Sequence, residues 1–180
     1  MHEELNQFKR NEVWDLVPKP TSHKSIGTNI IVRNKARLVA KGYNQEEGID
    51  YDETYAPGSR LEAIRLLLAF ACIMDFRLFQ MDVKSAFLNG LIEEKVYMDQ
   101  PPGFMDYKYP NHVYRLKKAL YDLKQAPRSW YERLSSFLIE QSFTRGLVDK
   151  TLFIKKVNSE LLIVQIYVDD IIFGATNEIV

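Results

Sequence analysis

The chain has 180 residues, of which 46% are hydrophobic and 27% charged, and this composition favours a folded core over intrinsic disorder. A formal net charge of zero argues against a uniformly basic nucleic-acid binder, and no apolar run reaches the roughly 18 residues that span a bilayer. The N-terminus does not resemble a signal peptide, and the single cysteine, Cys72, excludes a disulfide framework, so we expect an intracellular protein in which Cys72 is a small buried helix residue.

The first half of the chain predicts helices on either side of a β-rich stretch. Residues 2–11 favour a short helix, and the basic stretch 26–45 favours extended structure. Ser59 and Glu62 have the spacing of a capping box, which predicts the start of a helix whose apolar residues recur over 61–72.

The second half predicts mostly strands. Residues 77–84 alternate with a period of two, 112–116 favour a short strand, and 117–125 favour a short helix. Pro127 is well placed in the first turn of a further helix. Three short β runs joined by tight turns, within 151–175, predict a meander.

The order of these elements predicts an α+β fold. Strands alternate with helices and then follow one another directly, which is typical of helices packed on a partly antiparallel sheet. We expect the helices to cover one face of the sheet and to leave the other face open.

Charge is segregated along the sequence. Residues 113–156 hold ten Lys or Arg against four Asp or Glu, while the rest of the chain holds 14 basic and 20 acidic residues. The basic segment predicts either a surface for a polyanion or an ordinary solvated helix face.

Two adjacent carboxylates interrupt the apolar run LLIVQIYVDDIIFGA. Asp169 and Asp170 repel each other and are costly to bury unpaired. Strand alternation places Tyr167 and Asp169 on one face, and Gln80 and Asp82 on one face of the strand 77–84. If the apolar rows of both strands pack on the same helices, Asp82 and Asp169 share the open face, with Asp170 at the bend.

Carboxylates gathered in this way are typical ligands of hard divalent cations. Mg²⁺ binds through one or two carboxylates and completes its shell with water and phosphate oxygens. Two such ions can stabilise the attacking and leaving oxygens of a phosphoryl transfer. The alternative is an ordinary hairpin turn, since Asp-Asp pairs are common there.

Six blocks of the sequence together form a recognisable pattern: QMDVKSAFLNG (80–90), ALYDLKQAPRSWY (119–131), QIYVDDIIFGAT (165–176), and the stretches 35–57, 96–104 and 149–156. These blocks resemble the reverse transcriptase of Ty1/copia-type LTR retrotransposons. The resemblance covers nearly the whole chain, with the blocks in the family's order. It implies the fold of a right-hand polymerase, with the fingers over about residues 1–76 and the palm, which contains the catalytic hairpin, over 77–180. The palm of this family has a mostly antiparallel sheet that is backed by helices.

The resemblance also implies an activity and its catalytic residues. The reaction is template-directed addition of a dNTP to a primer 3′-hydroxyl on an RNA or DNA template. Asp82, Asp169 and Asp170 correspond to the metal-binding triad for two Mg²⁺ ions, with Mn²⁺ as a possible substitute. Strand alternation favours Asp82 and Asp169 as the main ligands and Asp170 as the auxiliary one.

Five further residues are implied in nucleotide binding. Phe87 corresponds to the bulky residue beneath the incoming sugar, and the alternative is an aromatic residue of the core. Gln125 corresponds to a polar residue that contacts the nucleotide, and the alternative is a capping or solvated glutamine. Lys35 and Arg37 are candidates for the triphosphate, because that chemistry needs cations opposite the phosphates. Tyr167 of the Tyr-Val-Asp-Asp motif completes the group.

Two arginines are candidates for contacts with the nucleic-acid backbone. Arg128 and Arg133 lie on the polar side of the helix that contains Pro127, where they could touch template phosphates. Trp130 of the same helix is expected in the core rather than stacked on a base.

The sequence departs from the family pattern at several places. The hairpin between Ile26 and Arg37 is shorter than usual, which truncates the expected nucleotide lid. Asp122 stands where the family usually has glycine, and a positive φ there would be uncomfortable for an aspartate. Gly58 and Ser59 replace a usual Val-Ala pair.

The chain ends at Val180, soon after the Asp-Asp pair, so we expect the thumb and RNase H domain to be absent. Apolar faces that they would cover are then exposed, which predicts poor solubility or association. Three functions therefore stay open: a reverse transcriptase fragment, an inactive transposon remnant, and a non-catalytic nucleic-acid-binding module using residues 113–156. By analogy with the family, the expected location is the cytoplasm, in virus-like particles, with no membrane partner.

Overall fold

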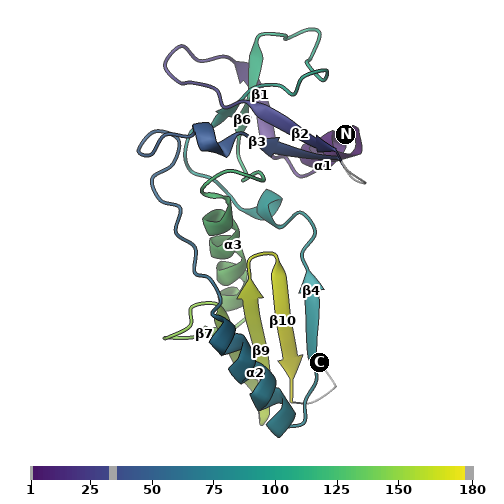
Figure 1. The fold of residues 1–180 in the computed structure, drawn as a ribbon, viewed down its shortest axis with the longest axis vertical. Helices are drawn as coiled ribbons and strands as arrows, with labels where there is room; N and C mark the ends of the chain where they lie inside the picture. Colours follow the sequence, from purple (N-terminus) through teal and green to yellow (C-terminus); the bar gives the residue numbers. More distant parts are fainter. Residues whose placement is uncertain (1, 33–35, 177–180) are drawn as a thin grey trace. The chain divides into compact units, whose positions relative to one another are not determined.

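The computed structural model describes residues 2–32 and 36–176 and divides the chain into two compact units (Figure 1). Unit 1 comprises Met1–Tyr55 and Phe87–Trp130, and unit 2 comprises Ala56–Ala86 and Tyr131–Val180. Each unit is built from two separate stretches of sequence, which differs from a single boundary near residue 76. The assignment of fingers and palm stays a prediction.

Unit 1 combines a helix with two small antiparallel sheets. One sheet has the strand order β1-β6-β5, and the other is the β2-β3 hairpin. Both η2 (Ala86–Asn89) and α3 (Ala126–Glu140) contain residues of each unit. The other elements are α1 (His2–Arg10), β1 (Trp14–Pro18), β2 (Thr28–Val32), β3 (Ala36–Ala40), the 3₁₀ helix η1 (Gly42–Asn44), β5 (Tyr97–Met98) and β6 (His112–Leu116).

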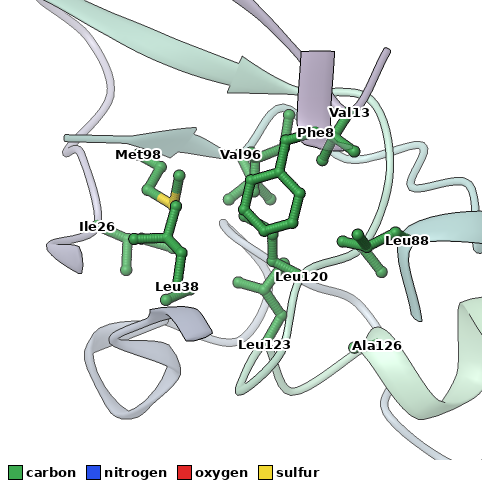
Figure 2. Close-up of a cluster of buried hydrophobic side chains, with 13 residues drawn as sticks. Phe8, Val13, Ile26, Leu38, Leu88, Val96, Met98, Leu120, Leu123 and Ala126 are labelled. Atoms are coloured by element: carbon green, nitrogen blue, oxygen red, sulfur yellow. The ribbon is translucent and has the colours of Figure 1, made fainter. Parts of the chain in front are cut away.

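A cluster of buried apolar side chains forms the core of unit 1. Phe8 of α1 and Leu38 of β3 are fully buried, together with Met98 of β5. Figure 2 shows these side chains gathered with Leu88 and Leu120, which come from distant parts of the sequence. The helix predicted at 2–11 is thus confirmed, and its burial of Phe8 anchors it to the unit.

The short helix predicted at 117–125 is wrong. These residues form turns, and the carbonyl of Tyr121 accepts a hydrogen bond of 3.1 Å from the N–H of Ala40. Asp122 has a φ of 74°, a left-handed conformation that interrupts any right-handed helix. Pairing with a distant strand therefore overrides the local helical pattern.

Unit 2 contains an antiparallel sheet with the strand order β4-β10-β9-β8-β7. The strand predicted at 77–84 and the meander within 151–175 are both confirmed, as is the helix that begins beside Pro127. Figure 1 shows β4, β10 and β9 side by side. The elements of this unit are α2 (Leu61–Ile73), β4 (Leu78–Asp82), β7 (Thr144–Arg145), β8 (Leu152–Val157), β9 (Glu160–Tyr167) and β10 (Asp170–Ala175).

Helices pack on both faces of this sheet. Leu67 of α2 packs with Ile163 of β9, whereas Leu138 of α3 packs with Ile166. Because side chains alternate along a strand, Ile163 and Ile166 lie on opposite faces. The expectation of one open face is wrong, since both side-chain rows of β9 are largely apolar and each needs a cover.

The start of α2 also differs from the prediction. Its N-cap is Arg60, in an extended conformation and without a side-chain capping bond. The Ser59 hydroxyl instead accepts a hydrogen bond of 2.9 Å from Nε2 of Gln165, so the predicted capping box is wrong. Cys72 is exposed rather than buried, because it faces away from the side of α2 that covers the sheet.

Apolar surface is exposed on unit 2, as expected. Leu66 and Ile73 of α2 point to solvent, and Phe79 and Met81 of the edge strand β4 are 55% and 45% exposed. The face of β4 that carries Phe79 and Met81 was predicted to pack against helices. At the edge of the sheet, however, the Phe79 ring stacks on the Phe173 ring, with 5.7 Å between the ring centroids, and stays partly exposed. Among the described residues, no helix has the length and apolarity needed to cross a bilayer.

Candidate functional site

The register between β4 and β10 brings two carboxylates together. Asp82, the last residue of β4, is directly opposite Asp170, the first residue of β10, and Asp170 is also opposite Tyr167 at the end of β9. Residues that are directly opposite in an antiparallel pair project from the same face. Asp82, Asp170 and Tyr167 therefore share one face at one end of the sheet.

Asp169 lies in the turn rather than on a strand. Because β9 ends at Tyr167 and β10 begins at Asp170, Val168 and Asp169 form a two-residue connection. The N–H of Val83 donates a hydrogen bond of 2.8 Å to the carbonyl of Asp169, which fixes the turn beside the residue that follows Asp82.

The strand-alternation argument for Asp169 is therefore wrong, because the alternation ends before the turn. The residue that shares a face with Asp82 is Asp170. All three carboxylate residues nevertheless lie at one end of one hairpin and its neighbouring strand. The relative importance of Asp169 and Asp170 as ligands stays a prediction.

The backbone of this turn is strained at Val168. Its φ of 56° is in the left-handed region, while Asp169 has no such φ, which is the pattern of a type II′ turn. That turn favours glycine at its first central position, and a β-branched residue there is a true conformational outlier. Such strain is found at functional sites more often than elsewhere.

The two facing carboxylates are suited to a divalent cation. Like charges directly opposite each other destabilise a strand pair, and a cation would relieve this repulsion. No group of three His, Cys, Asp or Glu side chains is arranged to hold a metal ion within residues 2–32 and 36–176. A pair is sufficient for Mg²⁺, which uses one or two carboxylates and takes its other ligands from water and phosphates.

A buried polar network supports the strand that leads to the turn. Gln165 of β9 is only 1% exposed and lies on the same face as Tyr167. Its Nε2 is 2.9 Å from Oγ of Ser59 and 3.2 Å from Oδ2 of Asp149, and Oδ1 of Asp149 accepts bonds from the N–H and hydroxyl of Thr151. The network links β9 to the segments before α2 and β8. Its one sequence signal was a glutamine inside an apolar run.

Gln165→Leu is expected to lower the free energy of unfolding by about 1–3 kcal/mol, because it leaves the partly buried Ser59 hydroxyl and Asp149 carboxylate without their donor. Urea denaturation followed by circular dichroism measures this. The same change at the exposed Gln141 is the control and is expected to have little effect. Equal stability of the two variants would show that the network contributes nothing.

Unit 1 brings together two of the predicted nucleotide-binding residues. The guanidinium carbon of Arg37 lies 4.2 Å from the ring centroid of Tyr121, and the Phe87 ring meets the same ring edge-on at 5.2 Å. Phe87 is half-buried and packs on the core, so the structure is compatible with either of its two predicted roles. Tyr121 links the two residues, and sequence reasoning missed it although it is the aromatic residue of ALYDLKQ.

Gln125 is engaged inside unit 1. It is 1% exposed, its Oε1 accepts a bond of 2.9 Å from Gln45, and its Nε2 donates to the carbonyl of Asp50 at 3.0 Å. The alternative of a solvated glutamine is therefore wrong. Its direct contact with a nucleotide stays a prediction, while its observed bonds fix the loop around Asp50.

The remaining predicted residues have different surroundings. Arg128 forms an ion pair with Glu53, and Arg133 is exposed on α3. Trp130 is buried, as expected. Lys35 lies outside the described residues.

Comparison with known proteins identifies the family. Residues 11–180 match the family model described as reverse transcriptase (RNA-dependent DNA polymerase). The chain belongs to the reverse transcriptase family. The resemblance seen in the motifs is thus confirmed.

Several relatives of this reverse transcriptase chain are transposon polyproteins. The Pol polyprotein of transposon RE1 from Arabidopsis thaliana is 42% identical over 96% of the chain, and that of transposon TNT 1-94 from Nicotiana tabacum is 37% identical over 96%. The Gag-Pol polyprotein of transposon Ty1-BL from Saccharomyces cerevisiae is 30% identical over 98%. The chain spans only 13%, 14% and 10% of these relatives, respectively.

The departure at Asp122 has a structural consequence in this reverse transcriptase chain. Its φ of 74° is the positive value that was expected to be uncomfortable, and it lies between Tyr121 and Leu123, against Gly42. Glycine adopts this conformation without the steric cost of a Cβ.

Asp122→Gly is expected to raise the free energy of unfolding by about 0.5–1 kcal/mol, since it removes that cost. Asp122→Ala is the matched control: it removes the same carboxylate but keeps a Cβ, and it is expected to destabilise the chain. Urea midpoints compare the two variants. If both variants were stabilised, repulsion by the carboxylate rather than backbone strain would be responsible.

Proposed function

We propose that this chain carries the polymerase chemistry of a Ty1/copia-type Pol polyprotein: template-directed attack of a primer 3′-hydroxyl on the α-phosphate of a dNTP, with release of pyrophosphate. The observation that carries the proposal is the register that sets Asp82 opposite Asp170, beside the turn that holds Asp169. It stands in a chain whose family is that of RNA-dependent DNA polymerases.

Asp82, Asp169 and Asp170 would hold two Mg²⁺ ions, or Mn²⁺ in their place. Bound there, the ions would neutralise charge on the attacking and leaving oxygens. Asp82 and Asp170 lie on neighbouring strands at one end of the sheet, and Gln165 anchors the adjacent strand β9. A site on strands holds its groups more precisely than a site on loops.

Two of the proposed nucleotide-binding residues, Arg37 and Phe87, belong to unit 1. Arg37 carries the cation for the triphosphate, and the ring of Tyr121 limits the freedom of its guanidinium. Phe87 meets the same Tyr121 ring edge-on, and its bulky ring is the proposed restriction on the sugar. For the template, Arg133 is the exposed candidate, whereas Arg128 would exchange Glu53 for a phosphate.

The partners in this proposal are a primed RNA or DNA template, a dNTP and the remaining parts of the polyprotein. The proposed location is intracellular. Because the chain is a small part of its relatives, we expect little or no extension by the chain alone.

Single-nucleotide addition to a primer on a homopolymer template tests the proposal, with Mg²⁺ or Mn²⁺ and a labelled dNTP over long incubations. We expect faint, cation-dependent addition that Asp169→Asn abolishes. If the Asp169→Asn variant added the nucleotide as well as wild type, Asp169 would not be a catalytic residue and this part of the proposal would be contradicted. Processive synthesis by the chain alone would contradict the expected weakness.

A second candidate is a non-catalytic nucleic-acid-binding module, which the basic excess of residues 113–156 favours. Its binding to an RNA–DNA duplex should weaken with salt and survive Asp169→Asn. Such binding without any nucleotide addition or cation binding would favour this function. An inactive remnant would show none of these properties.

A further inference from the structure

A hydrogen-bond donor to which the sequence analysis gave no role, Gln80, lies beside the facing carboxylates. Gln80 precedes Asp82 by two residues in β4, so both side chains lie on the same face. Its cross-strand partner is Ile172 of β10, which places Gln80 diagonally to Asp170. Its Nε2 donates a hydrogen bond of 3.1 Å to Oδ1 of Asp170.

This contact acts on the like-charge pair directly. Asp82 and Asp170 repel each other across the strands, and a neutral amide donor stabilises the ionised carboxylate that it contacts. A carboxylate offers about four lone-pair positions, and this bond uses one of them. Gln80 can therefore keep its hydrogen bond to Asp170 while a cation occupies the remaining positions.

We propose that Gln80 is a positioning residue for the metal-binding pair: it holds the Asp170 carboxylate beside Asp82 and thereby sets the affinity of the site for divalent cations. This inference rests on the proposed function, since it takes Asp82 and Asp170 as metal ligands. Carboxylates that bind metals are themselves hydrogen-bonded, and loss of such a partner typically costs 10–100-fold in affinity.

Mn²⁺ binding to the full chain, measured from the electron paramagnetic resonance signal of the free ion, tests this role. Gln80→Leu removes the donor and is expected to weaken binding by about tenfold or more. Gln80→Glu also removes the donor but supplies a ligand oxygen, so its affinity is expected to equal or exceed that of wild type. Gln141→Glu makes the same charge change at an exposed residue after α3 and is expected to have no effect.

A residue that merely packs the strand would give a different pattern, with the Leu and Glu variants equally impaired. That result, or wild-type affinity in Gln80→Leu, would overturn the proposal.

A double-mutant cycle without metal tests the contact itself. In EDTA, Gln80→Leu is expected to reduce the folding equilibrium constant by about fivefold, but by much less when Asp170→Ala is already present. Equal effects in both backgrounds would show that the bond to Asp170 contributes nothing and would overturn the proposal.

The two levels of inference can fail separately. If Mn²⁺ binding depends on Asp82 but not on Gln80, the positioning role fails and the proposed function stands. If the Asp82→Asn variant binds Mn²⁺ as tightly as wild type does, the proposed metal site is wrong, and the role of Gln80 is wrong with it.

Discussion

The Asp82→Asn variant is expected to bind Mn²⁺ at least about 100-fold more weakly than wild type, while its metal-free form unfolds at a slightly higher temperature. The first effect follows from losing a carboxylate ligand. The second follows from removing the repulsion between two like charges that are directly opposite across β4 and β10. The opposite signs of the two changes make this prediction specific.

The Mn²⁺ affinity and the unfolding temperature can be measured on one preparation. The affinity comes from a titration followed by electron paramagnetic resonance of free Mn²⁺, and the unfolding temperature from thermal unfolding in EDTA. Glu140→Gln is the matched control, because it neutralises an exposed carboxylate at the end of α3 in the same unit. It is expected to leave Mn²⁺ binding unchanged. A drop in stability of the metal-free Asp82→Asn variant would mean that the carboxylate has a structural role instead.

Gly42→Ala is expected to destabilise unit 1 by about 3 kcal/mol or more. The reason is that the added Cβ would overlap a neighbouring stretch of backbone in a region that is already fully packed. A Cβ on this glycine would lie 1.7 Å from the carbonyl oxygen of Asp122 and 2.8 Å from its carbonyl carbon. Both atoms belong to the backbone, so no side-chain rotation can relieve the contact. The turn that carries Tyr121 would have to move.

Urea unfolding followed by tryptophan fluorescence reports on this change, because Trp14 and Trp130 both belong to unit 1. Gly58→Ala is the control, since a Cβ there meets nothing within 4 Å. We expect a large shift of the midpoint for Gly42→Ala and almost none for Gly58→Ala. Similar midpoints for wild type and Gly42→Ala would show that Asp122 and Leu123 are not held against Gly42.

Local periodicity predicted the elements of this fold where the pattern and the packing agree. The alternation over 77–84 predicts β4, and the short apolar runs between tight turns predict the meander that holds Asp170. The predictions failed where a distant residue competes for a local group. Gln165 takes the hydroxyl of Ser59 away from the predicted cap, and Ala40 pairs with Tyr121 in what had looked like a helix.

The candidate site shows the same limit. Strand alternation correctly placed Asp82 on the same face as Gln80, although that face is not left open by the helices. The alternation cannot be continued through a turn, so Asp169 was assigned the position that Asp170 occupies. Gln80 and Tyr121 carry no signal of their own, because their contacts with Asp170 and Arg37 depend on strands and loops far apart in the sequence. Only the register of β4 against β10 reveals the first of these contacts.

The most direct test of the proposed metal site is anomalous X-ray scattering from crystals of the chain grown with Mn²⁺ and a dNTP. We expect an anomalous peak within bonding distance of both Asp82 and Asp170, at the end of the β9–β10 hairpin. Ordered Mn²⁺ bound only at other carboxylates, with none at this pair, would contradict the proposed site.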